Sequence, residues 1–290
     1  MKNITFLGPV GATFSHDAYN ILAIMYKAPK VTNENCIPAA SNGEILKIIG
    51  QHGGYGAIAM ETLAEGRVAE PLESFIDLLR DCKDNNDCPF GIIGALRLKI
   101  HFCLMARKGI PATAITKIIA HPKALGACKE KIIKMGITTI NAPSNGEAAR
   151  LVAENSEYAE CGALGPVSAT EKYGLTIHEA AFEDGEAITT FFLIGPKEHK
   201  VSLGKENRIL IVFKVPHTPG ALVKSLLPFE QEDLNLIQIH SVHAGNHTYN
   251  FAIEVEVSEN RLETLNRAMK VFTRHVETYL SFGPFEILSR

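Results

Sequence analysis

Short apolar runs alternate with segments of helical periodicity along the first two thirds of the chain. Runs such as Ile4–Leu7, Ala57–Met60 and Thr116–Ala120 are short and mostly apolar, as buried strands are. Between such runs, apolar residues recur every three or four positions, for example within Leu72–Leu79, which is typical of the buried face of a helix. Repeated strand–helix units predict an α/β fold with parallel sheets and helices on both faces.

The last third of the chain has an order of its own. Residues 196–207 are polar and show no periodicity, which indicates a linker. The pattern that follows predicts a compact βαββαβ unit. Its expected elements are a strand at Arg208–Val215, a helix at Leu222–Phe229, strands at Leu234–His243 and His247–Val257, a helix at Glu259–His275 and a last strand near Tyr279–Phe285. We therefore expect two domains, residues 1–196 and residues 208–290.

Composition narrows the class of protein. A chain of 290 residues with 46% hydrophobic residues can build two well-packed domains. A net charge of −3 gives no basic footprint for nucleic acid. No apolar run approaches the roughly 18–20 residues of a membrane span, and the N-terminus enters a strand without the apolar core of a signal peptide. We expect a cytoplasmic protein with neither nucleic acid nor membrane as a partner.

The six cysteines are dispersed along the chain, without a CxxC pair or a metal-ligand spacing. Dispersed cysteines in a chain of this length are typical of reduced thiols. We therefore expect neither a disulfide framework nor a metal site.

Two stretches place polar residues where a strand leads into a helix. In the first, Thr13 and Ser15 precede a helix whose backbone N–H groups could hold an anion, although hydroxyl capping is the simpler structural account. In the second, the strand from Tyr55 reaches Glu61 and Thr62 and turns at Gly66. Open α/β sheets bind ligands at such ends, whereas the alternative is an ordinary turn with solvated charges.

Two further patterns carry candidate chemistry. Arg97, Lys99 and His101 fall on one face of a predicted strand. They form either a solvated edge or one wall of an anion site. Farther along, Ser144 followed by Glu147 has the pattern of a capping box at the start of a helix.

Several blocks, taken in order, resemble the prephenate dehydratase family with its C-terminal ACT regulatory domain. The blocks are FLGPVGATFSHDA (residues 6–18), HPKALGAC (121–128), SNGEAARLVAE (144–154), EKYGL (171–175) and PGAL (219–222). The resemblance covers essentially the whole chain. It implies an α/β fold in which a two-lobed catalytic domain, like a type II periplasmic binding protein, precedes a βαββαβ ACT domain. The lobes would comprise residues 1–80 with 186–196, and residues 90–185.

The resemblance also implies an activity. The family's substrate, prephenate, is a dianion with two carboxylates and a ring hydroxyl, and it would bind in the cleft between the lobes. A dehydratase releases the ring carboxylate as CO₂ and expels the hydroxyl, so a hydrogen-bond donor must lie beside that hydroxyl. The resemblance implies no cofactor. It implies a homodimer or homotetramer that is assembled in part through ACT domains. It also implies an aromatic amino acid effector.

The sequence departs from the family at its expected site. The family's Glu-Asn-Ser is Glu61-Thr62-Leu63 here, and its Thr-Arg-Phe is Thr189-Thr190-Phe191. An arginine that forks onto a carboxylate has no equivalent in threonine. The family's Glu-Ser-Arg-Pro effector motif is replaced by residues His240–His243, which puts phenylalanine binding in doubt. The expected effector residues are Gly220, Ala221, Leu222, His240 and Ser241.

Two reactions fit these departures. A dehydratase would use Thr189 as donor to the leaving hydroxyl, with Glu61 and Thr62 organising the pocket. A non-aromatising prephenate decarboxylase would lose CO₂, protonate a ring carbon and keep the hydroxyl. Loss of the Asn-Ser pair and the Arg favours the decarboxylase. A third hypothesis, a non-catalytic sensor of aromatic acids, lacks a partner domain to receive a signal.

The decarboxylase hypothesis assigns roles to particular residues. Glu61 or His101 would be the proton donor, and Arg67 and Arg97 would anchor carboxylates. The remaining expected substrate-binding residues are Thr13, Ser15, Thr62, Ser144, Asn145, Thr190 and Phe191. Of these, Thr13, Ser15, Ser144 and Asn145 would bind the anionic tail at helix N-termini.

Overall fold

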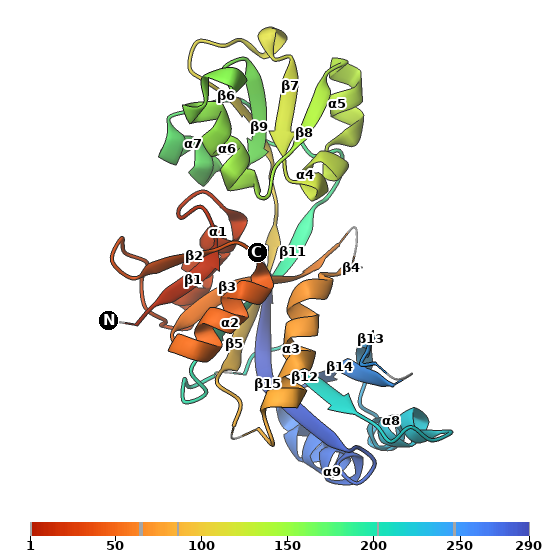
Figure 1. Ribbon diagram of the computed structural model, residues 1–290. Coiled ribbons are helices and arrows are strands. Elements are labelled where there is room, and N and C mark those ends of the chain that lie inside the picture. The colour runs from red at the N-terminus through yellow and green to blue at the C-terminus, as the bar shows by residue number, and fades with distance from the viewer. Residues whose placement is uncertain (1, 64–65, 86, 202, 246–247, 290) are drawn as a thin grey trace.

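The computed structural model describes residues 2–63, 66–85, 87–201, 203–245 and 248–289. Figure 1 shows three parts: a first lobe at the centre, a second lobe above it, and a C-terminal domain at the opposite end. The α/β class and the two-lobed arrangement are confirmed.

The first lobe is a mixed sheet with three helices. Its strands lie in the order β2-β1-β3-β11-β5, with the short β4 beside β3. β1 pairs in parallel with β2 and β3, and β11 runs antiparallel to β3 and β5. The strands are β1 (Ile4–Leu7), β2 (Cys36–Ala39), β3 (Tyr55–Thr62), β4 (Gly66–Arg67), β5 (Gly91–Lys99) and β11 (Ile188–Gly195); the helices are α1 (Phe14–Met25), α2 (Asn42–His52) and α3 (Ala69–Asp81).

The second lobe is a five-stranded sheet in the order β10-β6-β9-β7-β8. Its strands are β6 (Cys103–Ala106), β7 (Lys117–Ala120), β8 (Thr138–Asn141), β9 (Cys161–Gly165) and β10 (Thr176–Glu179), and its helices are α4 (Pro122–Ala127), α5 (Lys129–Met135), α6 (Asn145–Glu154) and α7 (Val167–Tyr173). Two chain crossings join the lobes, and they bond to each other. Ile100 N donates to Ala187 O over 2.7 Å, and Phe182 N donates to Phe102 O over 2.8 Å.

The C-terminal domain has the expected βαββαβ order. Its elements are β12 (Asn207–Lys214), α8 (Ala221–Gln231), β13 (Leu236–His243), β14 (Tyr249–Val257), α9 (Leu262–Phe272) and β15 (Thr278–Ser289). The two helices cover one face of its sheet, where Phe213, Phe229 and Phe272 form the centre of a separate core cluster.

The last strand joins this domain to the first lobe. β15 pairs antiparallel with β12 from Thr278 onward, and its final residues Ile287–Ser289 pair in parallel with β5. The strands of both parts thereby form one ten-stranded sheet, β13-β14-β12-β15-β5-β11-β3-β1-β2 with β4 beside it. We expected a unit appended through a polar linker; the structure adds a continuous sheet across that linker.

An apolar cluster reinforces the junction. Phe75 of α3 lies against Phe282 of β15 with ring centroids 4.9 Å apart, and Phe90 contacts both rings. The same cluster contains residues of β12 and β14. The C-terminal sheet is therefore covered by its own helices on one face and by α3 on the other.

Several sequence predictions need correction. The lobe boundary expected near residue 90 is wrong, because β5 pairs with β11 in the first-lobe sheet and the second lobe begins only at β6. The segment that begins in the HPKALGAC block forms two helices, α4 and α5, which are separated at Cys128. Strands β2, β4 and β10 were not predicted. All three are short, and most residues of β2 and β10 are at least partly exposed, unlike those of a buried strand.

The shared core predicts that the first lobe and the C-terminal domain unfold together. Phe282→Ala removes a ring that is 3% exposed, so we expect a loss of about 3–5 kcal/mol in unfolding free energy. Urea denaturation followed by circular dichroism would measure it. Val223→Ala, at a residue 69% exposed on α8, should change stability by less than about 0.5 kcal/mol. Separate transitions for the two parts of the wild-type chain would contradict the prediction.

Candidate functional site

A cleft of about 520 Å³ lies between the two lobes. Its walls come from the ends of first-lobe strands, from the crossings, and from the starts of helices in both lobes. The lining residues are Leu7, Thr13, Phe14, Ser15, Asn42, Ala59, Thr62, Leu63, Val68, Glu70, Ile100, Phe102, His121, Lys123, Ala124, Gly126, Ala127, Ser144, Asn145, Ala187, Ile188, Thr189 and Phe191. Most of this surface is apolar. Among these described residues, Glu70, His121 and Lys123 are the ionisable ones.

The lobes contact each other beside the cleft. Ser144 Oγ donates to Gly8 O over 3.0 Å, and Ser168 Oγ donates to Asp17 Oδ2 over 3.0 Å. The Lys172 ammonium also donates to Val10 O. These bonds hold the second lobe against the loop before α1 and against the first turn of that helix.

Three of the expected anion-binding hydroxyls already have hydrogen-bond acceptors in the fold. Thr13 Oγ1 donates to Leu7 O over 2.8 Å and accepts from His16 N, which makes it the N-cap of α1. Ser15 Oγ donates to Ala57 O over 2.7 Å. Ser144, whose hydroxyl proton goes to Gly8, is the N-cap of α6 and accepts from Glu147 N over 3.0 Å. The hydroxyl protons of these three residues are used in hydrogen bonds within the fold. A ligand could therefore only donate to the remaining lone pairs of their oxygens.

The capping box predicted at Ser144 is half formed. The serine accepts from the Glu147 backbone, but the Glu147 carboxylate binds the guanidinium of Arg150 instead of returning to the cap. That guanidinium lowers the pKa of Glu147. Asn145, also expected in the site, lines the cleft and its Oδ1 accepts from His121 N over 2.9 Å.

Strand alternation divides the remaining expected residues between two faces of the first-lobe sheet. Thr189 lies opposite Thr62, and Phe191 lies opposite Ala59; all four line the cleft. Thr190, the residue between, lies opposite Glu61 on one side and Arg97 on the other. Because successive side chains point to opposite faces, the row Glu61–Thr190–Arg97 is turned away from the cleft.

The side chains of that row are bound elsewhere. The Glu61 carboxylate accepts from Gln238 Nε2 over 2.8 Å. Arg97 forks onto Glu206, with both N–O distances 2.7 Å. Thr190 is buried and does not line the cleft. The structure thus places the expected proton donor Glu61, the expected anchor Arg97 and the binding residue Thr190 outside the cleft.

His101 also lies outside it. The residue is in the first crossing, with Nδ1 2.7 Å from Glu183 Oε1 in the second crossing, and its side chain is 48% exposed. The neighbouring residues Ile100 and Phe102 line the cleft instead. The side chain of Arg67, the other expected anchor, lies outside the described part of the structure; its backbone pairs with Glu61.

The start of α4 supplies cleft residues that were not predicted. His121 is its N-cap, with Nδ1 accepting from Lys123 N over 3.2 Å. A neutral imidazole that accepts at Nδ1 carries its proton on Nε2. Lys123 is part of the HPKALGAC block of the family resemblance, and the turn after β7 brings this cation to the cleft. Asn42, Glu70 and the rings of Phe14 and Phe102 were missed as well.

Thr62 has an uncommitted hydroxyl. Its Oγ1 is buried and has no hydrogen-bond partner within the described residues. Buried polar atoms are normally satisfied, and this one lies on the cleft face beside Thr189. The Thr62–Thr189 pair is therefore the part of the cleft best prepared to bind a polar ligand group.

A polar network lies on the opposite face. Arg208 donates to Glu206 and to the buried Glu254, both over 3.0 Å. The Arg97 guanidinium, together with Arg208, holds the pKa of the Glu206 carboxyl below its usual range. This network connects β5 to β12 and β14.

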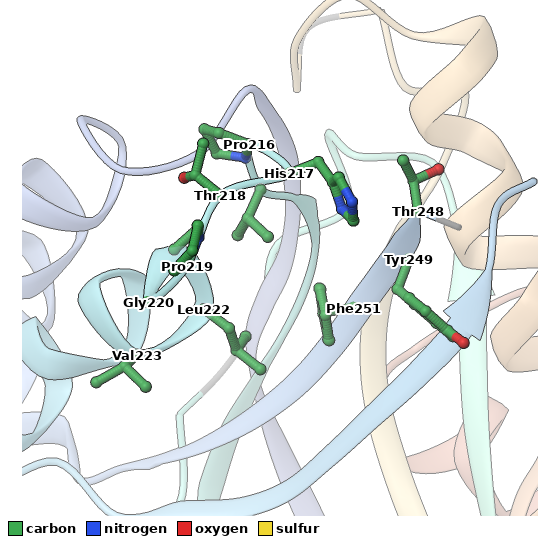
Figure 2. Close-up of a pocket in the computed structure, with 12 residues that line it drawn as sticks. Pro216, His217, Thr218, Pro219, Gly220, Leu222, Val223, Thr248, Tyr249 and Phe251 are labelled. Carbon is green, nitrogen blue, oxygen red and sulfur yellow. The ribbon is translucent and has the colours of Figure 1, made fainter. Parts of the chain in front are cut away.

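A second cavity, of about 450 Å³, lies in the C-terminal domain. Figure 2 shows the loop Pro216–Gly220 on one side and Thr248, Tyr249 and Phe251 on the other. Gly220 takes a positive φ of 79° as the N-cap of α8. Of the expected effector residues, Gly220, Ala221 and Leu222 line this cavity, whereas His240 and Ser241 do not.

The described residues include no group of three or more metal-ligating side chains placed to hold an ion. Among them there is also no helix long and apolar enough to cross a membrane. The six cysteines are free thiols. Burial raises the pKa of Cys128 to about 12, so this thiol is protonated at neutral pH.

Residues 4–199 match the family described as prephenate dehydratase. The chain belongs to the prephenate dehydratase family. A prephenate dehydratase from Methanocaldococcus jannaschii is 30% identical over 237 residues, which are 80% of this chain and 82% of that protein.

Solved structures share the fold. The prephenate dehydratase of Arthrobacter aurescens, in complex with L-Phe, aligns with a TM-score of 0.80 and 22% identity over 98% of this chain and 89% of that chain. The quorum quenching acylase GqqA aligns with a TM-score of 0.76 and 20% identity over 98% of each chain. Both alignments extend through the C-terminal domain, and at these identities they show the fold alone.

The pH dependence of stability tests the Arg97–Glu206 pair. Because the folded pKa of Glu206 is depressed, its contribution is fully present above the ordinary carboxyl pKa of about 4.3 and is lost as pH falls through the folded value. Glu206→Gln should therefore destabilise the protein at pH 7, and the difference should shrink below about pH 4. Urea unfolding at pH 7, 5, 4 and 3 would measure it. Glu198→Gln, at an exposed linker residue, should have no effect; an unchanged Glu206→Gln difference at acid pH would refute the assignment.

Proposed function

We propose that this chain is a prephenate lyase: it binds prephenate in the interlobe cleft, releases the ring carboxylate as CO₂ and keeps the ring hydroxyl. Family membership and the activity named for the M. jannaschii relative support prephenate as the substrate. The observation that carries the choice of reaction is the composition of the cleft face at Thr62 and Leu63.

The cleft suits a dianion with an apolar ring. Lys123 supplies a cation for one carboxylate, and an ammonium–carboxylate bond is stronger than a neutral one. The rings of Phe14, Phe102 and Phe191 provide an apolar surface against which the substrate ring can pack. A carboxylate held against such a surface loses solvation, which favours its departure as neutral CO₂.

The reaction consumes one proton. The bond between ring and carboxylate breaks, and its electron pair enters the ring and moves one double bond. A ring carbon then takes up the proton, so the hydroxyl stays. His121 is our candidate donor, because its Nδ1 is occupied by the helix cap and a neutral ring therefore carries its proton on Nε2.

We infer that the hydroxyl is retained from the hydrogen-bond donors that remain at positions 62 and 63. A dehydratase must stabilise a departing hydroxide, and the family's Asn and Ser would supply an amide and a hydroxyl at these positions. Here Thr62 keeps one hydroxyl and Leu63 is apolar. The lost arginine is not part of this argument, because position 190 is on the sheet face turned away from the cleft.

The second candidate is a prephenate dehydratase, and the position of Thr189 favours it. This threonine lines the cleft beside Thr62, where two hydroxyls could bond to the leaving group. In that reaction the electron pair displaces hydroxide, the proton ends in water, and the ring becomes aromatic.

We also propose that the cavity of the C-terminal domain is an effector site. Its apolar wall of Leu222 and Phe251 suits an aromatic or branched side chain, in keeping with an ACT regulatory role. The homodimer or homotetramer implied by the family resemblance stays a prediction.

Incubation with prephenate separates these reactions. We expect CO₂ release with the hydroxyl-bearing carbon and olefinic ring protons retained, because the cleft lacks the family's Asn and Ser donors. Proton NMR and ultraviolet absorbance would follow the products. Aromatic protons and loss of the hydroxyl would establish the dehydratase instead. Unchanged prephenate, with thermal stabilisation by aromatic acids, would support the sensor hypothesis and contradict both reactions.

Restoring the family's Asn and Ser tests whether their loss is the reason that the ring hydroxyl is kept. Thr62→Asn combined with Leu63→Ser should shift part of the product towards aromatic phenylpyruvate. A product ratio that does not move would remove these two positions from the explanation.

Lys123 should anchor a carboxylate. Lys123→Met removes the charge but keeps most of the side-chain length, so KM for prephenate should rise roughly 10–100-fold with a smaller change in kcat. Steady-state kinetics would measure both constants. Lys134→Met, at an exposed residue of α5, is the control and should behave as wild type. An unchanged KM in Lys123→Met would exclude the anchor.

A further inference from the structure

Seven polar residues form a closed ring between the first lobe and the C-terminal domain. Four links are hydrogen bonds: Glu61 to Gln238 at 2.8 Å, Arg97 to Glu206 at 2.7 Å, and Arg208 to both Glu206 and Glu254 at 3.0 Å. Three links are cross-strand neighbours: Glu61 with Thr190, Thr190 with Arg97, and Glu254 with Gln238. Three of the seven, Glu61, Arg97 and Thr190, belong to the first lobe, and the other four belong to the C-terminal part of the chain.

The first-lobe residues of the ring lie on the sheet face opposite the cleft, directly behind the cleft residues. Glu61 immediately precedes Thr62 in β3, and Thr190 immediately follows Thr189 in β11. Because successive side chains in a strand point to opposite faces, the backbone that places Glu61 also places Thr62. A bond that fixes the outer side chain fixes the cleft hydroxyl on the other side of the same strand.

Gln238 is the contact at the cleft end of this ring. It lies on β13, the edge strand of the C-terminal sheet. Its side chain bonds to Glu61, close to the end of β3 and just before the β3–β4 hairpin. The adjacent backbone is held by Leu63 N donating to Ile188 O over 2.8 Å and Val68 N donating to Met60 O over 2.9 Å. These amides report whether this wall of the cleft keeps its place.

We propose that Gln238 is a positioning residue for the cleft: through Glu61 it holds the end of β3, so that the Thr62 and Thr189 hydroxyls stay aligned toward the ligand. The C-terminal domain thus contributes to the site without touching the substrate. The kinetic part of this inference rests on the proposed function, whereas the backbone part does not.

An exchange of partners tests the proposal. Gln238→Glu opposes two carboxylates and should loosen the end of β3. The double variant Glu61→Gln/Gln238→Glu reverses donor and acceptor. It also returns the net charge of the pair from −2 in the single variant to −1, as in wild type. It should restore the bond. Hydrogen exchange of peptides covering Leu63 and Val68 should accelerate in Gln238→Glu and return toward wild type in the double variant.

Steady-state kinetics with prephenate supply the second measurement. In Gln238→Glu, kcat should fall roughly 10-fold while KM stays within about 2-fold, because Lys123 is untouched; the double variant should recover most of kcat. Ile239→Thr, at a residue 52% exposed on the same strand, is the control for general damage to β13 and should leave both measurements unchanged.

Each outcome decides the inference. Faster exchange at Leu63 and Val68 with a lower kcat, both rescued by the double variant, supports it. Unchanged exchange in Gln238→Glu, or faster exchange with an unaltered kcat, overturns it, as does a defect that the double variant does not repair. If the wild-type protein leaves prephenate unchanged, the proposed function fails, and the exchange pattern alone still decides whether Gln238 holds β3.

Discussion

The pairing of β15 with both β12 and β5 is the constraint on which the arrangement of this molecule depends. One strand contributes backbone hydrogen bonds to two parts of the chain that the sequence separates by a polar linker. The aromatic contacts of Phe282 with Phe75 and Phe90 exclude water from the same junction. With the sheet continuous and its outer face covered by α3, the C-terminal domain has a fixed orientation relative to the first lobe.

That orientation explains why the first-lobe sheet has two differently used faces. The cleft face carries small and apolar side chains with a few hydroxyls, and the helix starts around it provide backbone N–H groups. The outer face carries charged residues that pair with the C-terminal domain. Glu61 and Arg97 are therefore interface residues. The polar side chains that line the cleft include Thr62, Glu70 and Thr189 and, at the start of α4, His121 and Lys123.

Local patterns were sufficient to predict most helices and strands, because apolar periodicity is set by which face of an element is buried. The family resemblance was sufficient to predict Thr62, Thr189 and Phe191 as cleft residues, because it located the motifs that contain them. They could not assign Glu61, Thr190 and Arg97, whose direction depends on strand register and on a bulge beside Met60. Lys123 stands within a block of the family resemblance, but its place in the cleft depends on how the turn after β7 is packed between the two lobes. Sheet continuity through β15 could not be predicted either, since the strand's partners are far apart in the sequence.

The same strand gives the protein an unusual order of assembly during synthesis. β5 is made early, but its neighbour on one side is the final segment of β15. Until that segment emerges from the ribosome, β5 presents an open edge of backbone donors and acceptors, which is the kind of surface that recruits foreign strands. The first lobe therefore completes its sheet only through the pairing of Ala95–Arg97 with Ile287–Ser289, and contacts of such long sequence separation form slowly.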